Sequence, residues 1–139
     1  MIKRLLLVAL ASSWAACSMF EERASYTGPD DYAYTLSVSC FCIVTGPIRI
    51  TVENGVLVDA VALDPSFLQE NPNADAEIRE RAITLVELVD RVRDAQRTAD
   101  GFEADYDPTY GFPVVASIDY DKRATDDEVT YRVRDYTPL

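Results

Sequence analysis

Two cysteines separated by one residue, Cys40 and Cys42, are the pair in this sequence best suited to chemistry. Thiols tend to oxidise outside the cytoplasm. On an ideal strand this spacing places both side chains on one face, with Cα atoms about 6.6 Å apart, at the long end of the roughly 4.4–6.8 Å that a disulfide accepts. We interpret the pair as a disulfide that pins a bulge in a strand, or as a buried pair. The functional alternative is a redox-active Cys-x-Cys, because a strained bridge is easier to reduce.

Carboxylates in turns of the C-terminal half are candidates for binding a calcium ion. The set consists of Asp105, Asp107, Asp119, Asp121, Asp126, Asp127 and Glu128. Calcium takes about six to eight oxygen ligands, which carboxylate-rich loops supply. The spacing differs from an EF-hand loop, because Pro108 follows Asp107 and no glutamate stands where such a loop would close. Acids solvated in turns are the alternative interpretation.

An aromatic turn is the third candidate, as a site for a peptide or a glycan. It consists of Tyr106, Tyr110, Gly111, Phe112 and Pro113. Aromatic side chains are frequent interface anchors, so an exposed Tyr-Gly-Phe-Pro loop beside a sheet would be suited to gripping a ligand. The alternative is that the aromatic residues form cross-strand pairs in the core.

The composition argues against several classes of enzyme and partner. The 139 residues include no histidine, which removes the Ser-His-Asp triad, the Cys-His dyad and most zinc sites. The pattern singles out no pair of carboxylates for acid–base catalysis, so we predict a non-enzymatic protein without a cofactor. The formal net charge of −11 repels nucleic acid and anionic lipid headgroups.

The N-terminus has the features of an export signal. A basic start, an apolar run over residues 5–11 and then small residues predict a signal peptide over residues 1–16. The run Trp-Ala-Ala-Cys that ends at Cys17 resembles a bacterial lipobox, which implies cleavage before Cys17 and acylation of its thiol. Such a lipid would hold the protein to a membrane facing the periplasm, and Ser18 favours the outer membrane. The alternative is an ordinary signal peptide cut near Ala15.

Alternation of apolar and polar residues begins at Tyr32, after a segment of mixed charge over residues 17–31 that we interpret as a tether. The alternation predicts strands over residues 32–44, 48–53 and 56–63. Asn54-Gly55 between the last two runs is a strong hairpin signal, because both residues accept positive φ.

Three- and four-residue spacing from Ile78 to Ala95 then predicts one amphipathic helix, which follows a loop over residues 64–75 and ends before Gly101. Asn73 or Asp75 can cap its start. Further strands are expected within residues 102–106, 112–120 and 129–133. We therefore predict a single α+β domain over residues 32–139. It is an antiparallel sheet of about five to six strands in the order βββ-α-βββ, with the helix on one face and the other face open.

Several short motifs follow one another in a characteristic order. They are Tyr32-x-Tyr34, Cys40-x-Cys42, Val52-x-Asn54-Gly55-x-Leu57, Tyr106-Asp107, Gly111-Phe112-Pro113, Ile118-Asp119 and Asp126-Asp127-Glu128. Together they resemble an uncharacterised bacterial family catalogued as domain of unknown function 6174. The resemblance spans about residues 32–133 and implies a small secreted protein, often a lipoprotein. It implies no activity.

These patterns predict a cell-envelope lipoprotein that binds or scaffolds an envelope protein or peptide through the open sheet face. The alternative is a periplasmic thiol-redox or cation-responsive protein that uses Cys40 and Cys42 or the acidic turns. A large exposed apolar patch on the open face would favour binding. A solvent-open Cys40–Cys42 bridge would favour the redox function.

We expect Cys40 and Cys42 to be bridged in exported protein, because they have only each other in the chain once Cys17 is acylated. Iodoacetamide added to freshly exported, non-reduced protein should label neither thiol, and prior reduction should expose both. Labelling of both cysteines without reduction would rule out the bridge.

Overall fold

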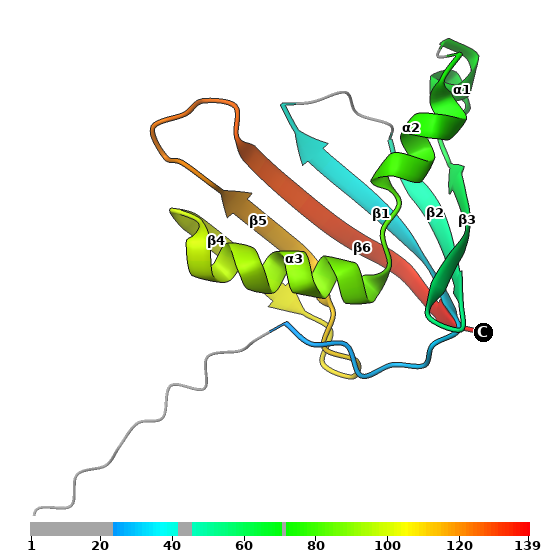
Figure 1. The fold of residues 1–139 in the computed structure, drawn as a ribbon, viewed down its shortest axis with the longest axis horizontal. Coiled ribbons are helices and arrows are strands. Elements are labelled where there is room, and N and C mark those ends of the chain that lie inside the picture. The colour runs from blue at the N-terminus through cyan, green and yellow to red at the C-terminus, as the bar shows by residue number, and fades with distance from the viewer. Residues whose placement is uncertain (1–23, 42–45, 71) are drawn as a thin grey trace, which may run out of the picture.

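The computed structural model describes residues 24–41, 46–70 and 72–139, which form one sheet and three helices (Figure 1). In chain order the elements are β1 (Tyr32–Cys40), β2 (Ile48–Glu53), β3 (Val56–Ala62), α1 (Pro65–Glu70), α2 (Ala74–Arg81), α3 (Leu85–Thr98), β4 (Gly101–Tyr106), β5 (Pro113–Asp119) and β6 (Glu128–Pro138). The strands are ordered β3-β2-β1-β6-β5-β4 and every pairing is antiparallel. The predicted α+β class and the βββ-α-βββ order are confirmed.

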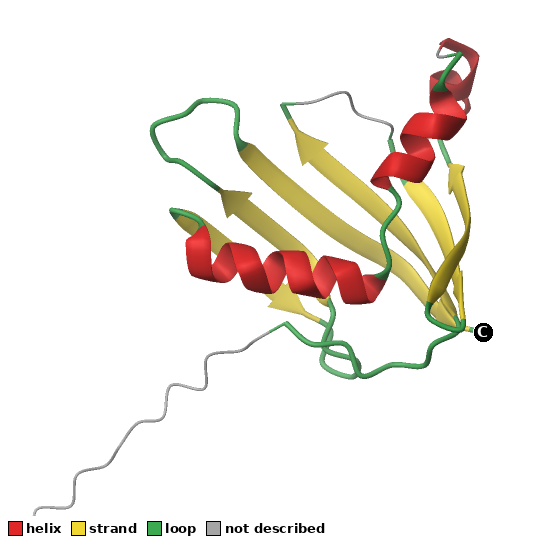
Figure 2. Ribbon diagram, in the orientation of Figure 1, coloured by secondary structure: helices red, strands yellow, loops and turns green. Residues whose placement is uncertain are grey.

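The helices lie over one side of the sheet and leave the other side open (Figure 2). Two three-stranded meanders, β1–β3 and β4–β6, are joined where β6 returns beside β1. The hairpin predicted at Asn54-Gly55 is present, and both residues have positive φ, 51° and 73°. Within the described part of the chain, no helix has the length and hydropathy needed to cross a membrane.

The helical region differs from the prediction of a single helix from about Ile78 to Ala95. Residues 82–84 separate α2 from α3, because Thr84 starts a new helix as its N-cap. The Thr84 side chain accepts a bond from the Glu87 N–H at 3.2 Å, and the Glu87 carboxylate accepts one from the Thr84 N–H at 2.7 Å. This capping box satisfies two backbone donors that a helix start leaves unpaired.

A further helix, α1, lies within the stretch predicted as a loop over residues 64–75. Asp64 precedes it and accepts bonds from the backbone N–H and the hydroxyl of Ser66, at 2.9 and 2.6 Å. These bonds lower the pKa of the Asp64 carboxyl. Phe67 of α1 packs against the core, whereas Leu68 is exposed.

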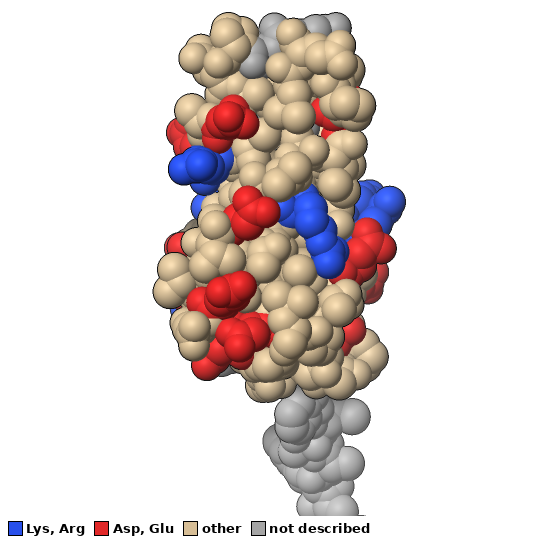
Figure 3. Space-filling view, turned by 90° about the vertical axis from the view of Figure 1, so that its right-hand side faces the viewer, with Lys and Arg blue, Asp and Glu red and all other residues tan. Residues whose placement is uncertain are grey.

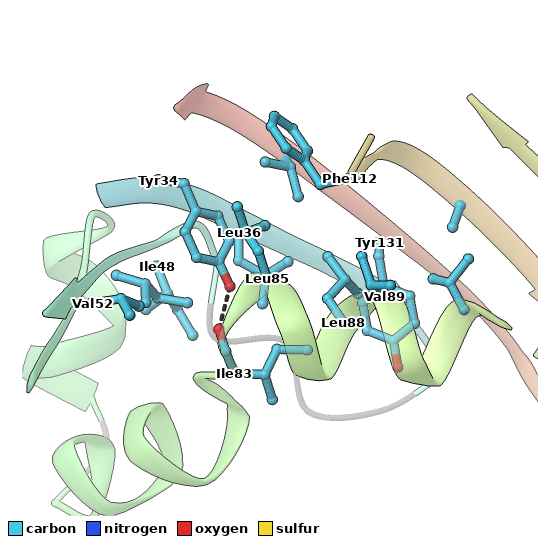
Figure 4. Close-up of a cluster of buried hydrophobic side chains, with 14 of the residues drawn as sticks. Tyr34, Leu36, Ile48, Val52, Ile83, Leu85, Leu88, Val89, Phe112 and Tyr131 are labelled. Atoms are coloured by element: carbon cyan, nitrogen blue, oxygen red, sulfur yellow. Dashed lines mark hydrogen bonds between the residues drawn. The ribbon is translucent and has the colours of Figure 1, made fainter. Parts of the chain in front are cut away.

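The core fills the space between the helices and the sheet (Figure 4). Its fully buried members include Tyr32, Tyr34, Leu36, Ile48, Ile50, Val52, Ile78, Leu85, Leu88, Val92 and Ile118. Two tyrosine hydroxyls of β1 bind the backbone at the break between α2 and α3. Tyr34 donates to the Ile83 carbonyl, and Tyr32 accepts from the Leu85 N–H at 2.9 Å. Since an unpaired buried backbone group costs about 1–3 kcal/mol, these bonds fix the break against β1.

The segment before β1 is part of the folded domain. Ala24 is 1% exposed and its carbonyl accepts a bond from Arg93 of α3 at 2.9 Å. Ser25 donates its N–H to the Gly111 carbonyl at 3.2 Å. Gly111 has φ of 76°, and a Cβ there would come within 2.9 Å of the Ser25 carbonyl oxygen. Residues 17–31 were predicted to form a tether. The described part of this stretch, from Ala24 onward, instead packs against the domain.

Replacing Tyr34 with phenylalanine keeps the ring but removes the hydroxyl that donates to the Ile83 carbonyl. Because this carbonyl would remain buried without its donor, we expect Tyr34→Phe to lower the free energy of unfolding by about 1–3 kcal/mol in urea denaturation. Tyr120 is 43% exposed, and Tyr120→Phe is the matched control, with an expected change within about 0.5 kcal/mol. Equal losses in the two variants would contradict the assigned role of the buried bond.

Candidate functional site

The predicted cysteine pair lies only partly within the described residues. Cys40 ends β1 and is half-buried. Cys42 lies outside the described residues, as does Cys17, so the Cys40–Cys42 bridge and the lipid on Cys17 stay predictions. The register shift in the β1–β6 pairing lies between Ala33 and Thr35, at the opposite end of β1 from Cys40. That bulge is therefore not one that the cysteine pair could pin.

The residues of the predicted aromatic turn pack inward. Phe112 is 3% exposed, Pro113 is fully buried, and Tyr106 and Tyr110 are half-buried. The rings of Phe112 and Tyr110 lie 5.0 and 5.1 Å from the ring of Tyr136, centroid to centroid. This arrangement corresponds to the core-packing alternative rather than to an exposed gripping loop.

The predicted acidic residues are spread over several turns and strands. Asp105 lies in β4, and Asp107 lies just after the end of that strand. Asp119 ends β5 and is the direct partner of Glu128 of β6. The connection between β5 and β6 contains Asp121, Asp126 and Asp127. Asp107 accepts a bond from the Tyr110 N–H at 2.7 Å, and Asp121 pairs with Arg123 at 2.9 Å, which lowers the pKa of the Asp121 carboxyl. Over residues 24–41, 46–70 and 72–139, no three Cys, Asp or Glu side chains are grouped as a metal site.

A groove on the helix side of the sheet is the site that sequence reasoning missed. It lies between α2 and α3 over the ends of β1 and β6 and has a volume of about 440 Å³. Its lining residues are Val38, Cys40, Glu77, Glu80, Arg81, Arg91, Val129 and Tyr131. Figure 1 shows why the space exists: α3 crosses the sheet nearer its other end and α2 stands beside β2 and β3. Neither α2 nor α3 crosses the ends of β1 and β6 that lie between them.

The floor of the groove is apolar. Val38 of β1 and Tyr131 of β6 are direct cross-strand partners, and Cys40 is paired in the same way with Val129. Strand alternation places all four on the helix side, in line with the buried Leu36. The groove thus continues the core to the surface, where an apolar body could be removed from water.

The rim of the groove is charged. Arg91 of α3 donates to the Tyr131 hydroxyl at 3.1 Å and lies 5.8 Å from the centre of that ring. The hydrogen bond to Tyr131 raises the pKa of Arg91, and a guanidinium is charged at any physiological pH. On α2, the Glu77 Oε2 atom is buried and has no hydrogen-bond partner within the described chain. The groove therefore combines an apolar floor, a fixed donor and a carboxylate oxygen that lacks a donor.

The open face is dominated by hydroxyl and charged side chains. Its central row contains Ser117 and Thr130, whose hydroxyl oxygens are 3.1 Å apart. Large exposed apolar side chains lie at the β3 edge of the sheet, where Val56, Val58 and Val61 are 62%, 51% and 46% exposed. Val61 is the direct partner of Arg49, and Val56 of Glu53, so these two valines belong to the open face. Figure 3 views the molecule from that edge, where charged side chains of both signs are scattered among uncharged ones. The open face is therefore polar over its central strands and apolar at its β3 edge.

One local signal in the sequence pointed toward the groove. Thr84-x-x-Glu87 is a capping-box pattern that predicts a helix start in the middle of the apolar stripe. A second helix starting there would have separated α2 from α3. No local pattern in the sequence predicts the floor of the groove, because Val38 and Tyr131 are brought together only by the β1–β6 pairing.

A model of a family of unknown function (DUF6174) matches residues 21–138 of the chain. This is the family that the order of the short motifs resembles. Neither the curated proteins nor the solved structures gave a match. The family match supplies a relationship but no activity.

Proposed function

The chain belongs to the family of unknown function DUF6174, and from that premise we propose that it is a lipid-anchored protein of the bacterial cell envelope that acts as a non-enzymatic binding module. The observation that carries the proposal is the groove between α2 and α3. Its volume of about 440 Å³ falls in the range of about 300–1,000 Å³ typical of ligand sites.

The groove chemistry suits an amphipathic ligand such as a segment of peptide. Val38, Val129 and the Tyr131 ring would cover an apolar side chain of the ligand. A polar end of the ligand would accept a bond from Arg91 and donate one to the buried Oε2 atom of Glu77. Such a donor would satisfy the oxygen that has no partner in the described chain.

The place where the chain enters the domain supports the anchor. Ala24, the first described residue, accepts a bond from Arg93 of α3 at 2.9 Å and is held against the domain. Seven residue steps from Cys17 to Ala24 span at most about 25 Å, so a lipid on Cys17 would keep the domain close to the membrane surface.

Binding in the groove is testable with anilinonaphthalene sulfonate, which carries an apolar body, an N–H donor and an anionic group. We expect saturable fluorescence enhancement, and Val129→Trp should weaken the affinity about tenfold, which is about 1.4 kcal/mol, because the indole fills the groove. Val115→Trp, on the open face of β5, is the control and should bind the dye like the unaltered protein. Urea denaturation of both variants checks that the fold is retained. An equal effect of the two substitutions, or none, would exclude the groove as the dye site.

Lipidation is testable from the intact mass of protein taken from the membrane fraction of its host. We expect cleavage before Cys17 and the added mass of a diacyl or triacyl modification, because the acyl chains anchor the protein stably. Cys17→Ser should release the protein into the soluble periplasm at its unmodified mass. An unlipidated mass for the unaltered protein would exclude the lipid anchor. It would not affect the proposal that the groove binds a ligand.

A further inference from the structure

Three arginines gather on the open face, on the opposite side of the sheet from the groove. Thr35 of β1 is directly paired with Arg49 of β2 on one side and with Arg134 of β6 on the other. Ser37, two residues further along β1, is paired with Arg132. Directly paired residues share a face, so all three arginines project from the same side. We refer to them as the open-face arginines.

Arg49 is fixed in place across the central strand. Its guanidinium donates to the carbonyl of Asp135 on β6 at 2.8 Å. A side chain that reaches from β2 to β6 must cross β1, which accounts for the 5% exposure of Ala33 and Thr35 on this otherwise open face. Asp135 directly follows Arg134, so the crossing brings the Arg49 guanidinium toward Arg134.

The open-face arginines lack the acidic partners found elsewhere in the molecule. Arg93 pairs with Asp90 at 3.0 Å and Arg123 with Asp121 at 2.9 Å. In the described part of the chain, no carboxylate makes an ion pair with any open-face arginine. This is unexpected for a protein with a net charge of −11. Arg132 and Arg134 are only about 7 Å apart along one strand, so the like charges repel unless an anion lies between them.

We propose that the open face docks a short acidic segment of a partner protein, whose carboxylates pair with the open-face arginines. A guanidinium presents a planar fork that binds a carboxylate through two parallel bonds. The two-residue spacing of Arg132 and Arg134 matches the spacing of side chains on one side of an extended peptide. Half-buried Ser37 is the direct partner of Arg132 and adds a hydroxyl as a further hydrogen-bonding group.

The surroundings favour a short acidic segment over an extended anionic surface. Along the row of Arg132, the next strands carry Val115 and then Asp105. Glu103 is directly paired with Ser117 on the same two strands. A bilayer or a nucleic acid that covered the whole face would meet these acids as well as the arginines. A segment confined to β1 and β6 meets mainly the arginines.

The test uses the purified full chain and a short fluorescent peptide with glutamate at every second position. We expect saturable anisotropy change with this peptide and none with its glutamine counterpart. Arg132→Gln/Arg134→Gln should weaken binding about tenfold, since two charge pairs are removed. The control Arg97→Gln/Arg123→Gln makes the same change in net charge at ion-paired arginines elsewhere and should bind normally. Raising the ionic strength should weaken binding, because exposed pairs are screened.

Three outcomes would overturn the proposal: no binding of the glutamate peptide, equal weakening in the control, or arginine-dependent binding of anionic phospholipid vesicles in preference to the peptide. Circular dichroism of the variants checks that they are folded. Arg132→Lys/Arg134→Lys is a second probe, which keeps the positive charges but removes the planar guanidinium groups. Because every substitution leaves the groove unchanged, the result is independent of the proposed function.

Discussion

The antiparallel pairing of β1 with β6 is the constraint on which the rest of the molecule depends. It joins a strand near the start of the domain to the last strand, from Tyr32 opposite Pro138 to Cys40 opposite Val129, with one register shift between Ala33 and Thr35. Without it the two meanders would be separate three-stranded sheets, and α3 would have no continuous apolar floor to cover. Such long-range pairing is slow to form, because the entropy of closing the chain is lost before its contacts are made.

The bulge near one end of this pairing shapes both sides of the sheet. Two residues of β6, Asp135 and Tyr136, oppose one residue of β1, and Asp135 has φ of 51°. The extra residue directs Tyr136 into the aromatic cluster, where its ring lies 5.0 Å from that of Phe112. It also presents the Asp135 carbonyl to Arg49 on the open face. A bulge re-aims side chains in this way because two residues share the space of one.

Local patterns in the sequence predicted the strands and the hairpin, because alternation and Asn54-Gly55 act over a few residues. The helix break was missed because the apolar stripe stays in phase from Ile78 to Leu85, although the Thr84 capping box was readable. The groove and the open-face arginines depend instead on which strands pair and in what register. Neither the placement of Tyr131 beside Val38 nor that of Arg134 beside Thr35 is encoded in any local window.

Both candidate surfaces draw on alternate residues of a single strand. Val129, Tyr131 and Val133 of β6 face the helices, while Thr130 and the arginines at 132 and 134 face the open side. A slip of one residue in the register of β6 would exchange the two sets, burying guanidinium groups against the core and exposing Tyr131. Burying unpaired charge is costly enough to exclude such a slip. The arginines that lack acidic partners on the open face therefore also help to specify the register that forms the groove floor.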